Sequence, residues 1–147
     1  MRPITIRTAT ISMLILFLSA CSTMSDVVAD KAGGTARIYD VPVDQAWNIA
    51  KTVFRWGGAD AIEEHRDNNY MLTSSGMNLV TYGAVMGAWV DPVDDAHSRV
   101  TVVTKRRISI NVFTTMREKT FHKMFTQAVD IVHSGAQLPS EAPPDKK

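Results

Sequence analysis

The apolar residues of this 147-residue chain change their spacing several times, and each spacing predicts a different element. Between Val43 and Phe54 they recur at intervals of three and four, which places them on one face of a helix. Gly57 and Gly58 end that helix, because glycine readily adopts the left-handed conformation that follows a last helical turn. A short strand over residues 36–39 precedes the helix.

Three further segments carry the pattern of β-strands. Residues 59–65 and 70–74 are short and flank the polar tetrapeptide 66–69, whose Asp and Asn residues are typical of a hairpin turn. Residues 99–112 alternate between apolar and polar side chains, as in a long amphipathic strand or a strand pair with a bend. A turn that opens at Asp91-Pro92 and runs to Ser98 precedes this alternating segment.

The longest apolar run covers residues 78–90. Its valine, tyrosine and tryptophan content favours a buried strand, in which Gly83 and Gly87 share one face. Glycines there permit sheet curvature and the close approach of another element. The alternative is a membrane helix with a GxxxG dimer motif, which needs about 20 apolar residues, more than this run supplies.

The last element is a long amphipathic helix that ends at Gly135. Thr115 and Glu118 have the spacing of a capping box, in which each side chain bonds the other residue's free backbone N–H. We expect Glu118 to face water with its polar neighbours. The apolar stripe of this helix consists of Phe121, Met124, Phe125, Ala128, Val129 and Val132.

The order of elements predicts an α+β fold. A curved antiparallel sheet of about five strands has an N-terminal helix and a long C-terminal helix packed on it, because its apolar face must be buried. This order resembles the helix-grip arrangement over roughly residues 35–135, in which a curved antiparallel sheet wraps a C-terminal helix.

The N-terminus resembles a bacterial lipoprotein signal. Arg2 and Arg7 form a basic region, residues 11–18 an apolar region, and Leu18-Ser19-Ala20-Cys21 a small-residue cleavage site before the only cysteine. The resemblance implies that the Cys21 thiol receives a diacylglyceryl group, that palmitate is added, and that Ser22 directs the protein to the outer membrane. A transmembrane anchor is the alternative, but the run is far short of the roughly 20 residues that a spanning helix needs.

The chain therefore divides into a signal peptide (1–20), a lipidated cysteine with a flexible tether (21–34), one α+β domain (35–135) and a disordered tail (136–147). Removal of the signal peptide takes two of the 16 basic residues and leaves 14 against 15 acidic ones. This near-neutral balance creates no field that favours nucleic acid. With Cys21 lipidated the domain has no thiol, which excludes disulfides and cysteine chemistry.

Among lipoproteins, the chain resembles the helix-grip domains of the BamC family, which are accessory lipoproteins of the outer-membrane β-barrel assembly machine. The lipobox, the helix start Pro42-Val43-Asp44-Gln45-Ala46-Trp47 and the aromatic-rich terminal helix carry this resemblance. It implies a domain on the periplasmic face of the outer membrane, held there by Cys21, that binds another envelope protein.

One cluster of acidic residues with a histidine could in principle hold a metal ion. Asp91, Asp94, Asp95 and His97 offer oxygen and nitrogen ligands, but the spacing of a calcium loop is missing and a solvated hairpin tip is the favoured interpretation. No metal site or cofactor is therefore predicted.

Two histidines have acidic neighbours. His65 shares a strand face with Glu63, where charges typical of an edge strand explain the pair equally well. His122 lies four residues after Glu118, the spacing of an exposed ion pair on a helix. No convergent acid, base and nucleophile is present, so no catalytic residue is assigned.

Arg106, Trp89 and Tyr82 are the candidates for a groove or interface. Arg106 shares the parity of the apolar residues in its strand, so either a bulge resets the alternation or the guanidinium lines a groove between sheet and helix. The aromatic side chains belong either to the core or to an apolar ligand pocket beneath the terminal helix.

The sequence thus predicts a lipid-anchored, non-enzymatic envelope protein that serves as a protein-binding or assembly accessory module. One alternative is a carrier or sensor of an apolar ligand such as a lipid, held in a groove under the C-terminal helix. A hydrolase that uses His65 or His122 is the weaker alternative.

Overall fold

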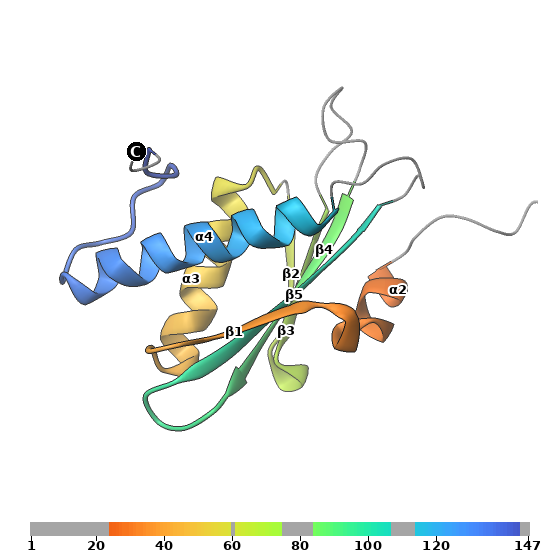
Figure 1. Ribbon diagram of the computed structural model, residues 1–147, viewed down its shortest axis with the longest axis horizontal. Helices are drawn as coiled ribbons and strands as arrows, with labels where there is room; N and C mark the ends of the chain where they lie inside the picture. The colour runs from red at the N-terminus through yellow and green to blue at the C-terminus, as the bar shows by residue number, and fades with distance from the viewer. Residues whose placement is uncertain (1–23, 60, 75–83, 107–113, 145–147) are drawn as a thin grey trace, which may run out of the picture.

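The computed structural model describes residues 24–59, 61–74, 84–106 and 114–144, with the side chains of Arg106 and residues 114–117 excepted (Figure 1). One antiparallel sheet of five strands has the order β1-β5-β4-β3-β2. The predicted α+β fold, with one helix after the first strand and a long one at the end, is confirmed. The elements are α2 (Met24–Ala29), η2 (Lys31–Gly33), β1 (Thr35–Tyr39), α3 (Val43–Trp56), β2 (Ala61–His65), η3 (Arg66–Asn68), β3 (Tyr70–Ser74), β4 (Ala84–Pro92), β5 (Ser98–Arg106) and α4 (Thr114–His133).

Both long helices cover the same face of the sheet, which we call the helix face (Figure 1). The apolar stripe of α3 buries six residues there, including Trp47 and Ile49; the sequence pattern had missed Ile49. Phe125 of α4 is fully buried against them. This cluster is the main core, because it joins both helices to all five strands, with β2 represented by the partly buried Ile62. Its strand members include Tyr39, Met71, Ala88, Val90, Val100 and Val102.

Two hairpins set the register of the sheet. In the β2–β3 hairpin Asn69 adopts the left-handed conformation (φ 57°), which asparagine tolerates better than most residues. The β4–β5 hairpin is longer than expected, because Pro92 still pairs with Ser98. The predicted turn opening at Asp91 therefore begins only at Val93.

The opposite face of the sheet, the outer face, is covered in part by α2. The sequence predicts a flexible tether over residues 21–34, but Met24–Ala29 is helical and Val27 is fully buried. Val27 packs with Leu72, Val85 and Trp89 in a second apolar cluster. The tether prediction is therefore wrong for this segment, because a single buried valine on a short helix gives no periodic signal to detect.

The covered outer face also corrects the predicted alternation of β5. Thr101 and Val103 are only 6% and 2% exposed, although the period-two pattern placed that parity in water. The remainder of the predicted strand, residues 107–112, lies outside the described residues.

Gly87 allows α2 to come close to the sheet. A Cβ atom at this position would lie 2.7 Å from Cγ1 of Val27 and 3.0 Å from the Trp89 ring. The predicted role of Gly87 in the close approach of another element is confirmed, and Gly83 lies outside the described residues.

The C-terminal segment differs in part from the predicted disordered tail. Residues 136–144 form no helix or strand, but Leu138 packs against the main core and the Trp56 indole N–H donates to the carbonyl of Pro139 at 3.0 Å. These two contacts fasten the start of the tail to α3. Within the described ranges, no helix has the length and apolar character needed to cross a bilayer.

Replacing Gly87 with alanine is expected to lower the free energy of unfolding by about 1–3 kcal/mol, because the added methyl overpacks the contact with Val27. Gly57→Ala is the matched control, since its Cβ would meet nothing nearer than 3.4 Å. That change should be neutral or stabilising by up to about 1 kcal/mol. Urea unfolding of both variants tests this, and equal stabilities would contradict it.

Candidate ligand cavity and buried polar cluster

A cavity of about 190 Å³, partly open to solvent, lies on the helix face between the end of α3, the first described turns of α4 and the sheet. Small residues help to create it, because Gly57, Ala59 and Ala84 leave space that longer side chains would fill. The cavity is lined by Val53, Phe54, Gly57, Ala59, Thr73, Ala84, Met86, Thr120, Phe121 and Met124.

Among the described side chains of the cavity wall, those of Thr73 and Thr120 carry hydroxyl groups and the others are apolar. The Thr73 hydroxyl donates to the carbonyl of Ala61 at 2.7 Å, which occupies its only proton. The lining residues include no acid, base or thiol. Such described side chains offer contact area for apolar groups.

A buried polar cluster joins α4 to strands β1 and β5. The His122 ring lies between the Tyr39 hydroxyl, 2.8 Å from Nδ1, and the Thr35 carbonyl, 2.8 Å from Nε2. The Glu118 carboxylate accepts the Thr104 N–H at 2.9 Å and the Thr35 hydroxyl at 2.5 Å. Each contact satisfies a group that burial would otherwise leave without a partner.

These contacts determine the proton position on His122. A carbonyl only accepts, so Nε2 carries the proton that points to Thr35 and Nδ1 accepts from the Tyr39 hydroxyl. Burial is the largest cause that lowers the pKa of His122, and the positive charge of Arg37 adds to it. The bond to Thr35 and the charge of Glu118 oppose this lowering. The imidazole is therefore neutral at pH 7.

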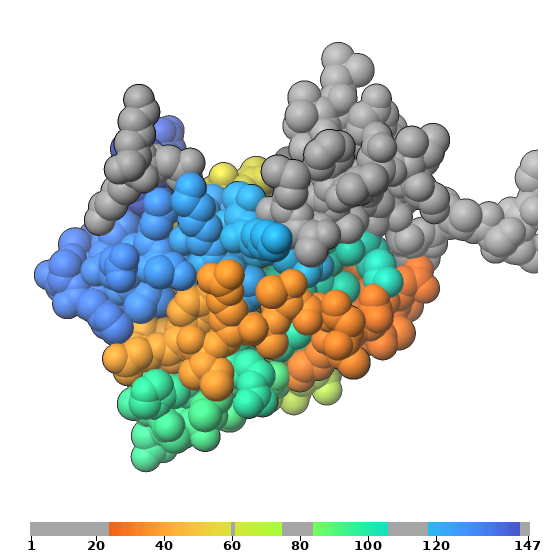
Figure 2. Space-filling view, viewed as in Figure 1, coloured from red at the N-terminus to blue at the C-terminus, as the bar shows by residue number. Residues whose placement is uncertain are grey.

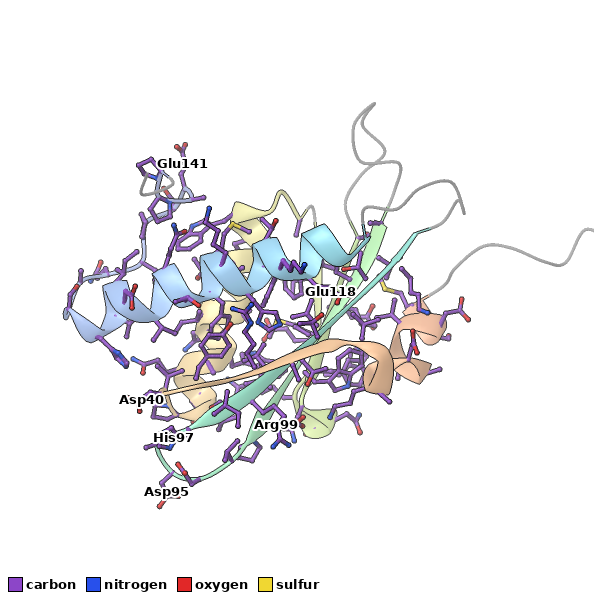
Figure 3. The ribbon with its side chains drawn as sticks, viewed as in Figure 1. Asp40, Asp95, His97, Arg99, Glu118 and Glu141 are labelled. Atoms are coloured by element: carbon purple, nitrogen blue, oxygen red, sulfur yellow. The ribbon has the colours of Figure 1, made fainter. Side chains whose placement is uncertain are left out.

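Two predictions about α4 are wrong for the same reason. Glu118 and His122 are only 8% and 0% exposed, so they form no exposed ion pair on the helix surface. The Glu118 carboxylate bonds the sheet, beneath α4 in Figure 3, and does not face water as predicted; the Thr115 side chain of the predicted capping box lies outside the description. Helix periodicity had assigned both residues to water, but β1 and β5 reach over that side of α4.

The pair of Glu63 and His65 lies on an edge strand, as predicted. Glu63 and His65 share one face, with 2.7 Å between carboxylate and Nε2, and β2 has β3 as its sole neighbour in the sheet. Glu64 points to the other face, where Lys51 and the Trp47 indole N–H bond its carboxylate. These donors, Lys51 first, lower the pKa of Glu64.

The acidic cluster at the β4–β5 hairpin is a turn stabilised by its own side chains. Asp94 accepts the N–H groups of Ala96 and His97 at 2.9 and 2.8 Å. Its contact with the His97 ring lowers the pKa of Asp94 and raises that of His97. Asp91 pairs instead with Lys31, at 2.8 Å. Across the part of the chain that the structure describes, no three His, Cys, Asp or Glu residues gather as metal ligands would.

The candidate groove residues do not meet at the cavity. Trp89 is 3% exposed and lies on the outer face in the second cluster, whereas the β4 residues Ala84 and Met86 line the cavity from the other parity. Arg106 pairs with Ala84 in the last described pair of β4 and β5, and its side chain, on which the choice between a bulge and a groove depends, lies outside the description. Tyr82 and Cys21 lie outside the described residues. The small residues that line the cavity carried no signal in the sequence.

No protein-family model and no curated protein matches the chain. Among solved structures it is similar to the di-domain ARO/CYC StfQ from the steffimycin biosynthetic pathway, at 10% identity and a TM-score of 0.46 over 69% of this chain. This chain spans 46% of StfQ, about half the length of that protein. A second similar structure is TTHA0849 from Thermus thermophilus, at 10% identity and a TM-score of 0.29, over 69% of this chain and 91% of that one. Likenesses of this strength carry no argument about activity.

The buried imidazole makes stability depend on pH. Below about pH 6.5 the unfolded chain protonates His122, while the folded protein takes up this proton only at its lower pKa. The free energy of unfolding therefore falls as the pH drops through this window. The amide of a glutamine at this position can still donate to the Thr35 carbonyl. In His122→Gln we therefore expect the free energy of unfolding to fall less between pH 7.5 and 5 than in the unchanged protein.

His97→Gln is the control with the opposite sign. The raised pKa of His97 contributes stability that is complete below about pH 6.5 and is lost as the pH rises through its folded value. In His97→Gln, the free energy of unfolding should therefore fall more steeply as the pH drops. Urea unfolding at a series of pH values measures both, and an unchanged slope in His122→Gln would refute the assignment.

Proposed function

We propose that the protein is a lipid-anchored, non-enzymatic module of the outer membrane that binds another envelope protein, and that an apolar side chain of that partner enters the cavity beneath α4. The lipobox that ends at Cys21 supports the anchor. The observation that carries the binding role is the small apolar cavity, whose wall offers contact area without a group for chemistry.

The size of the cavity favours a side chain over a whole lipid. Pockets for drug-sized ligands measure roughly 300–1,000 Å³, whereas an apolar cavity of about 150 Å³ holds a benzene molecule. At about 190 Å³, the cavity matches one aromatic or branched aliphatic group. Such anchors, inserted in a pocket, supply much of the affinity in protein interfaces.

A second candidate function rests on the same apolar wall. The end of an acyl chain has the chemistry and width of the proposed occupant, so a carrier or sensor of a lipid would use these lining residues too. Lipid in a solvent extract of the purified domain, with a lower melting temperature after its removal, would favour this function.

Filling the cavity should weaken partner binding while the fold persists. Ala59→Leu adds apolar volume at the wall, and Ala96→Leu adds the same group at the exposed β4–β5 hairpin as a control. Since a buried apolar side chain contributes about 1.5–3 kcal/mol, the first change should weaken binding roughly tenfold or more. The second should leave binding unchanged.

A photocrosslinking amino acid at Gly57, an exposed residue of the cavity wall, measures binding in intact cells. We expect one adduct with an envelope protein, lost in Ala59→Leu and in the unlipidated Cys21→Ser form. Adducts that persist equally in Ala59→Leu would disprove the role of the cavity. A protein that carries extractable lipid and forms no adduct would support the carrier function.

A further inference from the structure

We infer that α2 is a clamp that holds the folded domain close to the bilayer in one orientation, with the end that contains the cavity facing the lipid surface. The inference rests on the proposed lipid anchor at Cys21. It concerns how the anchor is joined to the domain, which the sequence had assigned to a flexible tether.

Several contacts fasten α2 and the residues after it to the outer face. Val27 is fully buried above Gly87, which lacks the side chain that would block this approach. On either side of it, Asp30 pairs with Lys105 at 2.5 Å and Lys31 with Asp91 at 2.8 Å. The Lys31 ammonium also lies 6.0 Å from the centre of the Trp89 ring. An apolar contact flanked by two ion pairs fixes both the position and the rotation of the segment.

A fixed α2 leaves little free chain between lipid and domain. Three residue steps separate Cys21 from Met24, the first residue of α2. Whatever its conformation, a chain of that length spans at most about 11 Å. A tether that stayed free as far as residue 34 would span roughly four times that distance when extended. The clamp therefore keeps the domain at the bilayer surface.

The clamp and the cavity lie on opposite faces of the sheet, at the same end of it. Val85 and Lys105 are register partners whose side chains contact the α2 segment on the outer face. The next pair, Ala84 and Arg106, is the last described pair of the β4–β5 ladder, and Ala84 lines the cavity on the helix face. Figure 2 shows the start of α2 beside the end of β5. The hairpin with Asp95 and His97 lies at the other end (Figure 3).

An anchor joined at the cavity end orients the domain. Ser98, where β5 leaves the hairpin, lies seven residues along the strand from Lys105, which corresponds to roughly 24 Å. With the cavity end at the bilayer, the cavity is presented to groups at the membrane surface, and the hairpin points into the aqueous space. The partner of this domain is then reached at the bilayer and not deep in the periplasm.

Energy transfer from the domain to the lipid headgroups tests this orientation. The mature chain has no thiol besides Cys21, which the lipid occupies, so a single dye can be placed through Ala61→Cys at the cavity end or Ala96→Cys at the hairpin. Both alanines are exposed. The lipidated proteins are reconstituted in vesicles of phosphatidylethanolamine and phosphatidylglycerol that carry a headgroup acceptor. We expect a higher transfer efficiency from position 61 than from position 96.

Two changes release the clamp by different routes. Val27→Asp places a charge in the buried contact, and Val28→Asp is the matched control because Val28 is 36% exposed. An insertion of about ten Gly and Ser residues between Thr23 and Met24 lengthens the connection without touching the fold. The difference in transfer should disappear with the insertion and with Val27→Asp, and should persist in Val28→Asp.

Equal transfer from the two positions in the otherwise unchanged protein would overturn the inference. A difference that survives the insertion would also overturn it, since the clamp would then not be its cause. Vesicle flotation separates these results from failure of the anchor. A chain that floats no better than its Cys21→Ser form is not lipidated, and both the anchor and the orientation are then refuted.

Discussion

The central strand pair, β4 and β5, must be shielded from water on both faces, and the other elements are arranged around that requirement. Val90, Val100 and Val102 are fully buried on the helix face, while Trp89 and Val103 are buried on the outer face. The apolar residues of the helix face are covered by α3 and α4. The second apolar cluster needs another cover, and the chain before β1 is the segment that provides it.

The same arrangement explains why the cavity and the clamp occur at one end of the sheet. On the helix face, Gly57 and Ala59, which follow α3, and Ala84 of β4 have small or no side chains, so space remains between the helices and the sheet. On the outer face, Gly87 leaves the opposite gap, and the Val27 side chain fills it. One gap is filled by a side chain of the same chain, and the other remains as the cavity of about 190 Å³.

Burial of Glu118 and His122 shows how α4 is held against the sheet. These two side chains bond the backbone of Thr104 and Thr35, so the helix satisfies strand groups that water cannot reach. An apolar helix face alone would permit rotation or sliding over the strands. Directional hydrogen bonds to two strands specify one register of the helix, and with it the shape of the cavity wall.

Much of the fold follows from short-range patterns in the sequence. The spacing of apolar residues in α3, the turn residues before Asn69 and the apolar content of β4 specify local backbone geometry, so the α+β class and most element positions were predictable. The predicted lipidation of Cys21 likewise rests on neighbouring residues.

The tertiary structure alone decided the remainder, because it depends on residues far apart in the chain. The spacing of apolar residues shows which side of a helix or strand is apolar. It does not show whether another element covers the polar side. Glu118 and Thr101 were assigned to water for that reason, and α2 was taken for a tether. A cavity is defined by volume left unfilled between elements, and no property of Ala59 or Ala84 in the sequence records that absence.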